Sequence, residues 1–209
     1  MKAHTLICLA ATFATGMAAA PITSLYNTGL DASGALLLGG NGTIDPHYNV
    51  ISGPGSPTSA RTFSVGAYFA NGPSSRWISS TATGGSAGTY VFETTFDLTG
   101  FNPSLTSITV SCGTDNFLDA VAINGAGVTG NCDGFSGGFT GMFSITSGFV
   151  TGINSLQFSV RDVGAPMAFR AQYTSDTTEL STVPEPGAFF LMACGLMVVA
   201  VRMRKGAAG

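Results

Sequence analysis

The sequence predicts an all-β protein, an antiparallel β-sandwich or jelly roll, flanked by an N-terminal signal peptide and a single C-terminal transmembrane helix. Short segments of alternating apolar and polar residues fill the middle of the chain, and Gly, Asn and Pro separate them, which is typical of many short strands. Each end instead contains a predominantly apolar run, at 6–13 and at 188–201. A chain of 209 residues can hold one domain and two such segments. We therefore assign 1–19 to a signal peptide, 20–180 to the β-sandwich and 181–209 to a C-terminal membrane segment.

The N-terminal segment has the three parts of a secretory signal. Lys2 precedes an apolar run at 6–13, and small residues occupy most of 16–20. We expect cleavage after Ala18 or Ala19. The Sec machinery is therefore an expected partner, and the β-domain is expected to leave the cytoplasm.

The clearest strand is predicted at 90–98, where one face carries Tyr90, Phe92, Thr94, Phe96 and Leu98 and the other carries Val91, Glu93, Thr95 and Asp97. A period of two residues places such side chains on one buried face. Asn124 and Gly125 predict a tight turn after another strand. The remaining strands are predicted at 61–69, 107–112, 117–123, 139–145, 155–160 and 167–173. No segment between the two ends predicts an amphipathic helix, so these strands are expected to pack as two antiparallel sheets.

The charge of the middle region excludes one class of partner. Residues 21–183 hold ten Asp and Glu against four Arg, so their formal net charge is −6. Because nucleic-acid binding needs a basic surface, no nucleic acid is expected to bind.

Two of the four cysteines, Cys112 and Cys132, lie in the part that is expected to be exported. Oxidation is permitted in extracytoplasmic compartments. The two residues therefore predict a disulfide, and two buried thiols are the alternative.

The C-terminal segment predicts a membrane helix. Residues 188–201 form an uninterrupted apolar stretch of 14 residues, followed by Arg202, Arg204 and Lys205. A helix of that length spans about 21 Å, shorter than the roughly 30 Å hydrocarbon core, so the bilayer would thin around it. A buried core helix is the alternative, but such helices are normally amphipathic. The cations favour a cytoplasmic C-terminus, with the β-domain on the other side of the membrane.

A Pro-Glu-Pro sequence stands directly before this apolar stretch, and basic residues stand directly after it. This ordered arrangement resembles the PEP-CTERM sorting signal of exosortase substrates. The residues that carry the resemblance are Pro184, Glu185, Pro186, Arg202, Arg204 and Lys205. It implies that the protein is tethered in the inner membrane with its domain in the periplasm and is cut by exosortase near 184–186. The domain would then reach the cell surface or the medium, in a bacterium that makes exopolysaccharide.

The middle region is similar to a domain common in PEP-CTERM proteins that has been likened to galactose-binding jelly rolls. The resemblance rests on short motifs at 45–48, 77–78, 88–90, 96–98, 115–116, 123–125 and 152–156. It implies the fold more than a ligand, because one fold hosts many functions.

Carbohydrate binding is one hypothesis for this domain. Aromatic rings can stack on sugars while polar side chains bond their hydroxyls. The residues that could do so are Trp77, Tyr48 and Tyr68 as stacking faces, with Asp45, Asn71 and Arg76 as polar partners. Packing of Trp77 in the core is the alternative.

Metal and enzyme sites are poorly supplied, so we expect no cofactor and no catalysis. Asp115, Asn116 and Asp133 could offer oxygen ligands to calcium, with turn capping as the alternative. His47 is the only histidine left after signal removal, which disfavours a serine triad and zinc. Carboxylates spaced four apart could suggest a glycosidase, namely Glu93 with Asp97 and Asp115 with Asp119.

The sequence thus predicts an exported, noncatalytic surface or extracellular-matrix protein. It would be sorted and processed by exosortase and associated with exopolysaccharide or the envelope. A carbohydrate-binding module with a defined sugar ligand and a glycan hydrolase are the alternative hypotheses.

Overall fold

The structure is a computed structural model that describes residues 19–139 and 141–178. The chain divides into two units, 1–179 and 180–209, and the described residues all belong to the first. Their elements are β1 (Ala19–Ala20), β2 (Ile44–Ser52), β3 (Thr58–Thr62), β4 (Ile78–Ser79), β5 (Gly88–Asp97), the 3-10 turn η1 (Pro103–Leu105), β6 (Ser107–Asp115), β7 (Phe117–Ile123), β8 (Ala126–Val128), β9 (Gly141–Ile145), β10 (Ile153–Asp162) and β11 (Ala168–Thr178).

The described ranges contain no helix long and apolar enough to cross a membrane. The predicted membrane helix at 188–201 lies outside these ranges, as does the signal peptide up to residue 18.

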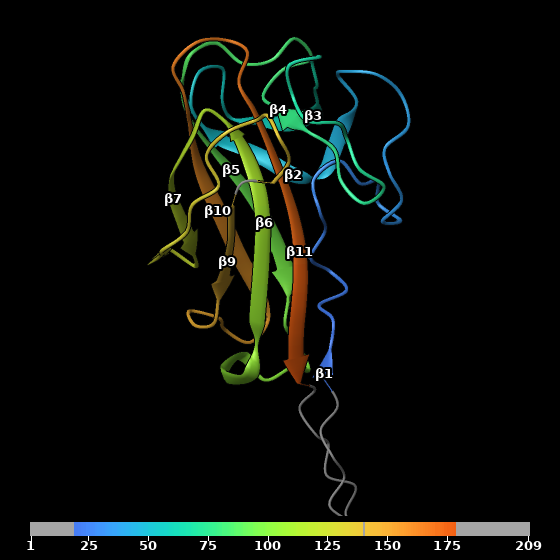
Figure 1. Cartoon of the computed structure of the whole chain (residues 1–209). Coiled ribbons are helices and arrows are strands. Elements are labelled where there is room, and N and C mark those ends of the chain that lie inside the picture. The colour runs from blue at the N-terminus through green and yellow to red at the C-terminus, as the bar shows by residue number, and fades with distance from the viewer. Residues whose placement is uncertain (1–18, 140, 179–209) are drawn as a thin grey trace, which may run out of the picture. The chain divides into compact units, whose positions relative to one another are not determined.

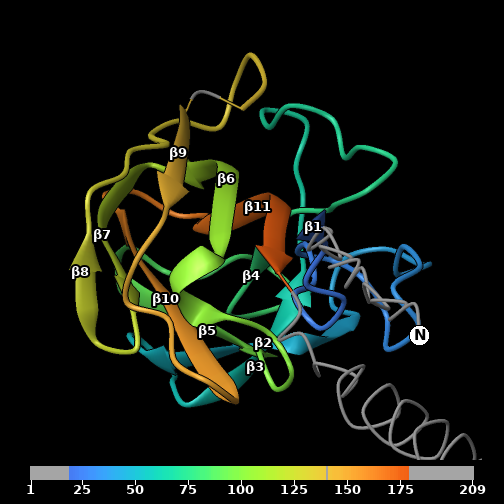
Figure 2. The ribbon, with the colours of Figure 1, turned by 90° about the horizontal axis from the view of Figure 1, so that it is seen from below.

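The strands form one antiparallel sheet in the order β8-β7-β10-β5-β2-β3-β4-β11-β6-β9, and β1 pairs with β11. The sheet curls around its core, so that it is nearly barrel-like when viewed along the strands (Figure 2). The strands β5 and β10 thereby face β11: Phe169 packs on Phe92 and Phe158, with ring centroids 5.2 and 4.8 Å apart. The all-β, antiparallel prediction is confirmed, but one continuous sheet supplies both faces of the core (Figure 1).

The strand predicted at 90–98 is confirmed as β5, and its alternation explains the core. Tyr90 and Phe92 are fully buried, whereas the intervening Val91 is only partly buried. Across the ladder they pair with Val160 and Phe158 of β10, which are also fully buried. Each such side chain contributes on the order of 1.5–3 kcal/mol when it leaves water.

The predicted turn at Asn124 and Gly125 is confirmed as the two-residue connection between β7 and β8. Both residues have positive φ, 50° and 81°, as the hairpin turn that matches strand twist requires. The Asn124 side chain also accepts a hydrogen bond from the Ser155 amide at 2.9 Å and donates one to the Gly148 carbonyl at 2.9 Å. The turn is therefore fastened to β10 and to the loop that precedes it.

The strand predicted at 61–69 is wrong beyond Thr62, where β3 ends. The next residues leave the sheet, and their aromatic side chains pack in a second hydrophobic cluster formed by Phe63, Tyr68, Trp77 and Ala168. The sequence also missed β2, which contains Pro46. Proline cannot donate to a ladder, and the pairing of β2 with β3 shifts register between Ile44 and Asn49.

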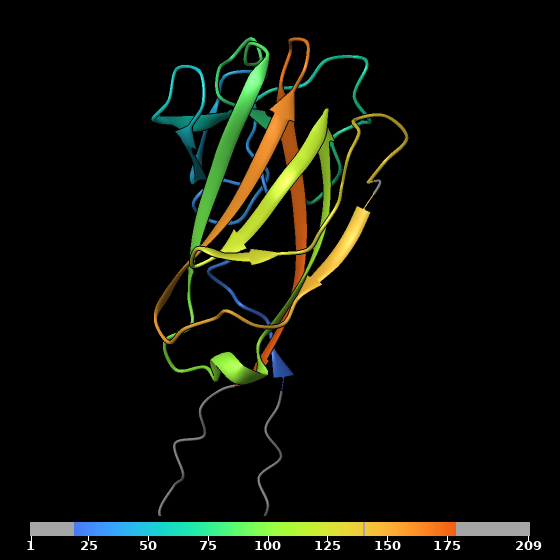
Figure 3. The same cartoon turned by 90° about the vertical axis from the view of Figure 1, so that its left-hand side faces the viewer.

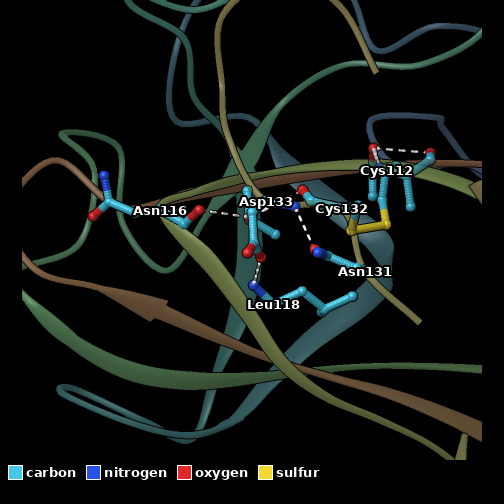
Figure 4. Close-up of a disulfide and its surroundings, with 9 residues drawn as sticks. Cys112, Asn116, Leu118, Asn131, Cys132 and Asp133 are labelled. Atoms are coloured by element: carbon cyan, nitrogen blue, oxygen red, sulfur yellow. Dashed lines mark hydrogen bonds between the residues drawn. A yellow bond between two sulfur atoms is a disulfide. The ribbon is translucent and has the colours of Figure 1, made fainter. Parts of the chain in front are cut away.

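The predicted disulfide is present between Cys112 and Cys132, whose Cα atoms lie 5.3 Å apart (Figure 4). Both cysteines are buried, and the bond ties β6 to the segment between β8 and β9. That segment pairs with the end of β6, where the Thr114 amide donates to the Gly134 carbonyl at 3.0 Å. Gly141 allows the close approach, because a Cβ atom there would lie 1.8 Å from the Asn131 carbonyl oxygen.

Candidate functional site

The last strand of the domain, β11, leads to the C-terminal sorting segment. It pairs with β6 along most of its length and with β1 at its end, where Ala19 and Ala20 stand opposite Thr178 and Thr177. The Thr177 hydroxyl is buried and lies 2.8 Å from that of Thr106, just after η1. The two ends of the described chain therefore leave the domain side by side, at one end of the sheet (Figures 1 and 3).

The structure does not present the predicted sugar-stacking rings, Trp77, Tyr48 and Tyr68, as an open platform. Two of the three rings offer no face to solvent. Trp77 is 0% exposed, lies between Tyr68 and Phe69, and donates from Nε1 to the Phe69 carbonyl at 2.9 Å. Tyr48 is also 0% exposed, and its hydroxyl donates to the Tyr26 carbonyl. Core packing, the alternative for Trp77, is what the geometry shows.

The polar members of the predicted sugar site hold loops in place. The Asn71 side chain accepts a hydrogen bond from the Trp77 amide at 2.9 Å, and Arg76 donates to the Gly39 carbonyl at 3.0 Å. Asp45 is buried and accepts from the backbone amide of Gly29 at 2.7 Å. Burial raises the pKa of Asp45 to about 6, although the backbone amides it accepts from lower it. Each of these three side chains thus bonds the backbone of a neighbouring segment.

The three calcium candidates are not gathered in one place by their side chains. The Asn116 side chain points away from Asp133 (Figure 4) and accepts a hydrogen bond from the Val163 amide at 2.9 Å. Asp133 accepts from the Leu118 amide at 2.7 Å. Asp115 is buried and accepts from the Tyr68 hydroxyl at 3.0 Å. These bonds join segments 47 and 15 positions apart, so both side chains hold distant backbone rather than cap a local turn.

The carboxylates considered for glycan hydrolysis each have separate partners. Glu93 accepts hydrogen bonds from Ser155 and Gln157 of β10, at 2.8 Å each. Asp97 accepts from the amide and hydroxyl of Thr99, and these bonds lower its pKa. A general acid needs a raised pKa, which Asp97 does not have.

Asp119, the remaining carboxylate of those pairs, lies on the exposed face of β7. It forms an ion pair with Arg161 at 2.9 Å, in which both side chains are about two-fifths exposed. Exposed pairs of this kind contribute about 0.2–1 kcal/mol, so this one is a surface contact. Asp115 lies buried at the end of β6, so this carboxylate pair is divided between the surface and the interior.

Sequence reasoning missed a buried cation, Arg170 of β11. Its side chain donates to the Ser75 hydroxyl at 2.8 Å and to the Ala70 carbonyl at 2.7 Å. The guanidinium also packs against the rings of Phe69 and Phe139, 4.9 Å from each centroid. Burial lowers the pKa of Arg170 to about 10, which leaves it charged at neutral pH. Its neighbours come from two loops far from it in sequence, the β3–β4 and β8–β9 connections, so no local motif could have revealed it.

The structure also contains an open hollow of about 420 Å³ beside β11. One side is formed by the segment after β1, including Tyr26 and Asn27, and the other by residues of β11, including Ser175. The Tyr26 ring stacks on His47, with centroids 3.6 Å apart and planes 9° from parallel. The hollow thus combines a supported aromatic ring with amide and hydroxyl groups.

The comparison with known families concerns the segment after β11. Residues 182–205 match the family described as the PEP-CTERM protein-sorting motif. The chain carries a PEP-CTERM sorting motif. The match includes the predicted sorting residues between Pro184 and Lys205, which lie outside the described ranges. It supports an exported exosortase substrate that is sorted through a membrane-anchored C-terminus and then processed.

No curated protein and no solved structure matches the chain. The resemblance of the β-domain to galactose-binding jelly rolls therefore stays a prediction, supported only at the level of an all-β, antiparallel fold.

Proposed function

We propose that this chain is a noncatalytic surface or extracellular-matrix protein that exosortase sorts and that acts through its β-domain. The observation that carries the proposal is the PEP-CTERM motif at 182–205, which begins four positions after the end of β11 at Thr178. The folded domain is therefore followed almost at once by the sorting signal. Association with exopolysaccharide or the envelope belongs to the same proposal.

The route has three steps. The Sec machinery exports the chain, and the apolar stretch at 188–201 tethers it in the inner membrane with the domain in the periplasm. Prolines at 184 and 186 disfavour a helix that would enter that stretch from the domain side. Exosortase then cuts near these prolines, and the domain moves to the cell surface or the medium.

The test is intact mass and fractionation of the native protein in cells with and without exosortase. The proposal expects a released form that ends near residue 186, only where exosortase is present. Substitution of 184–186 by three alanines should keep the protein at the membrane, whereas Ser181→Ala, just outside the motif, should leave release unchanged. A full-length membrane form in both strains would contradict the proposal and make the tail a simple anchor.

The noncatalytic part of the proposal is supported by the engagement of Glu93, Asp97 and Asp119 in separate surface contacts. A glycan hydrolase instead predicts turnover that is lost when one of these carboxylates, or Asp115, is replaced by its amide. Incubation of the released protein with the host's own polysaccharide, followed by analysis of reducing ends, measures this directly. Turnover that Asp115→Asn or Asp119→Asn abolishes would overturn the noncatalytic proposal.

Carbohydrate binding is a second candidate function. The hollow beside β11 is a better binding place for a sugar than Trp77, because the Trp77 ring is buried. Tyr26 would stack on a sugar, with the Ser175 hydroxyl bonding a hydroxyl of the sugar. We expect the released protein to be retarded in gels that contain the cognate polysaccharide. Tyr26→Ala should remove the retardation and Tyr26→Phe, which keeps the ring, should preserve it. Equal retardation of both variants would exclude the hollow as the binding site.

A further inference from the structure

Two buried carboxylates, Asp115 and Asp162, lie at one end of the sheet. Asp115 ends β6 and is 4% exposed, and Asp162 ends β10 and is 2% exposed. Within the described ranges the only ion pair is that of Arg161 with Asp119, so neither buried carboxylate is neutralised by a basic side chain there. Buried charges are costly unless they are paired or bind a metal.

Hydrogen bonds bring the ends of β6 and β10 together. The Asn116 amide, next to Asp115, donates to the Arg161 carbonyl at 3.0 Å. The Val163 amide, next to Asp162, donates to the Asn116 side chain at 2.9 Å. The connection from β10 to β11 that follows lies at the end of the domain away from β1 (Figure 1). Both carboxylates thus belong to one junction, where the ends of β6 and β10 meet. This junction is remote from the end of the domain at which β11 pairs with β1.

Tyr68 closes this junction from the side of the second hydrophobic cluster. Its hydroxyl lies 3.0 Å from an Asp115 oxygen and 2.7 Å from the Pro166 carbonyl oxygen. One hydroxyl hydrogen cannot serve both acceptors fully. The Asp115 and Pro166 oxygens therefore share a single hydroxyl donor, that of Tyr68.

Asp162 supplies the observation that points to a ligand. One of its carboxylate oxygens accepts from the Gly164 amide at 2.9 Å. The other, Oδ2, is buried and has no hydrogen-bond partner among the described residues. Burial raises the pKa of Asp115 to about 6, and the charge of nearby Asp162 raises it as well. A buried, unpartnered oxygen near a second carboxylate is a favourable place for a cation, because buried charges in proteins are paired or bind metals.

We propose that Asp115 and Asp162 are the two carboxylate ligands of a calcium site that fastens the β6–β7 turn to the β10–β11 connection. The available donors are oxygens, namely these two side chains and the Pro166 carbonyl, with water completing the six to eight ligands that calcium takes. The nearby sulfurs of Cys112 and Cys132 are consumed by their disulfide, which disfavours softer metals. Among the candidates from sequence, this site keeps Asp115 and replaces Asn116 and Asp133 by Asp162.

The protein contains a built-in reporter for this site. Trp77 is the only tryptophan, and its ring lies 4.8 Å from that of Tyr68, which bonds Asp115. The experiment adds CaCl₂ at pH 7.5 to chelator-treated full-length protein in detergent and follows Trp77 fluorescence and thermal unfolding. Calcium at about 100 times its dissociation constant should raise the unfolding temperature by roughly 5–10 °C. A chelator should reverse both changes, and titration calorimetry should give one ion per chain.

Variants decide whether the response comes from this junction. Asp162→Asn should abolish both calcium responses while unfolding, without calcium, within a few degrees of the wild type, because the buried unpartnered charge is gone. Asp115→Asn is the second variant and should behave in the same way. Asp176→Asn, which removes a charge from the exposed face of β11, is the matched control and should keep the response. No shift with millimolar calcium, or an unchanged response in folded Asp162→Asn protein, would overturn the proposal.

Discussion

Replacing both members of the Cys112–Cys132 disulfide by alanine should strongly destabilise the domain. The bond closes a loop with a sequence separation of 20. In the chain-entropy model such a loop stabilises the folded state by about 3 kcal/mol, because the unfolded chain loses conformations. Both cysteines are buried, with 0% and 1% exposure, so truncation also removes packing. We therefore expect a loss of about 3–5 kcal/mol, or at least a hundredfold change in the folding equilibrium.

Urea unfolding of the purified protein, followed by Trp77 fluorescence, measures this loss. If the entropy argument is correct, the variant should also show a larger denaturant slope, because its unfolded chain is less compact. Intact mass under non-reducing conditions, two hydrogen masses below the reduced value, verifies the bond. A loss below about 1 kcal/mol, or two free thiols in the folded wild type, would refute the reasoning.

Three further predictions follow from individual side chains. Trp77→Ala should cost about 3–5 kcal/mol in urea unfolding followed by circular dichroism, since it empties a buried site; unchanged stability would argue against its core role. Asn124→Ala should cost about 1–3 kcal/mol, because its φ of 50° disfavours a side chain there, and Asn124→Gly should recover part of that loss. Burial raises the folded-state pKa of Asp115 to about 6, from 3.8, so the folded protein binds this proton more tightly. The resulting stabilisation is complete below about pH 4 and is lost as pH rises through 6, by an amount on the order of 1–3 kcal/mol. In chelator, the unfolding free energy of the wild type relative to that of Asp115→Asn should therefore fall between about pH 4 and 6. A difference that does not change with pH would contradict the prediction.

Much of the fold could be predicted because apolar and polar side chains alternate along any strand that has one buried face. The segment predicted at 117–123 coincides with β7, since the Asn124 turn marks its end. The error at 63–69 has a physical cause: the aromatic rings there are buried in a cluster outside the sheet. Apolar residues therefore signal burial but not the element that buries them. β2 was hidden by Pro46 and by its irregular pairing.

The candidate sites were less predictable, because composition does not tell a ligand platform from a packed loop. Trp77 and Asn71 have the residue types of a sugar site, yet both side chains bond backbone groups. The Asn71 side chain accepts from the Trp77 amide, and the Trp77 ring nitrogen donates to the Phe69 carbonyl. The disulfide was predictable because Cys112 and Cys132 are the only cysteines between the two terminal segments. Asp162 was missed because its partner Asp115 lies 47 positions away and is brought near only by the fold.

The place of β11 in the sheet couples folding to sorting. β11 is the last strand of the described residues, yet it lies between β4 and β6, and its Phe169 packs against both Phe92 and Phe158. The curled sheet therefore cannot close until this strand has been exported, when the motif at 182–205 is the next segment to arrive. A secreted chain that ends at residue 163 should leave those rings exposed and be digested rapidly by protease, whereas one that ends at 179 should resist. Equal resistance of the two truncations would show that the domain closes without β11 and would separate its folding from its tethering.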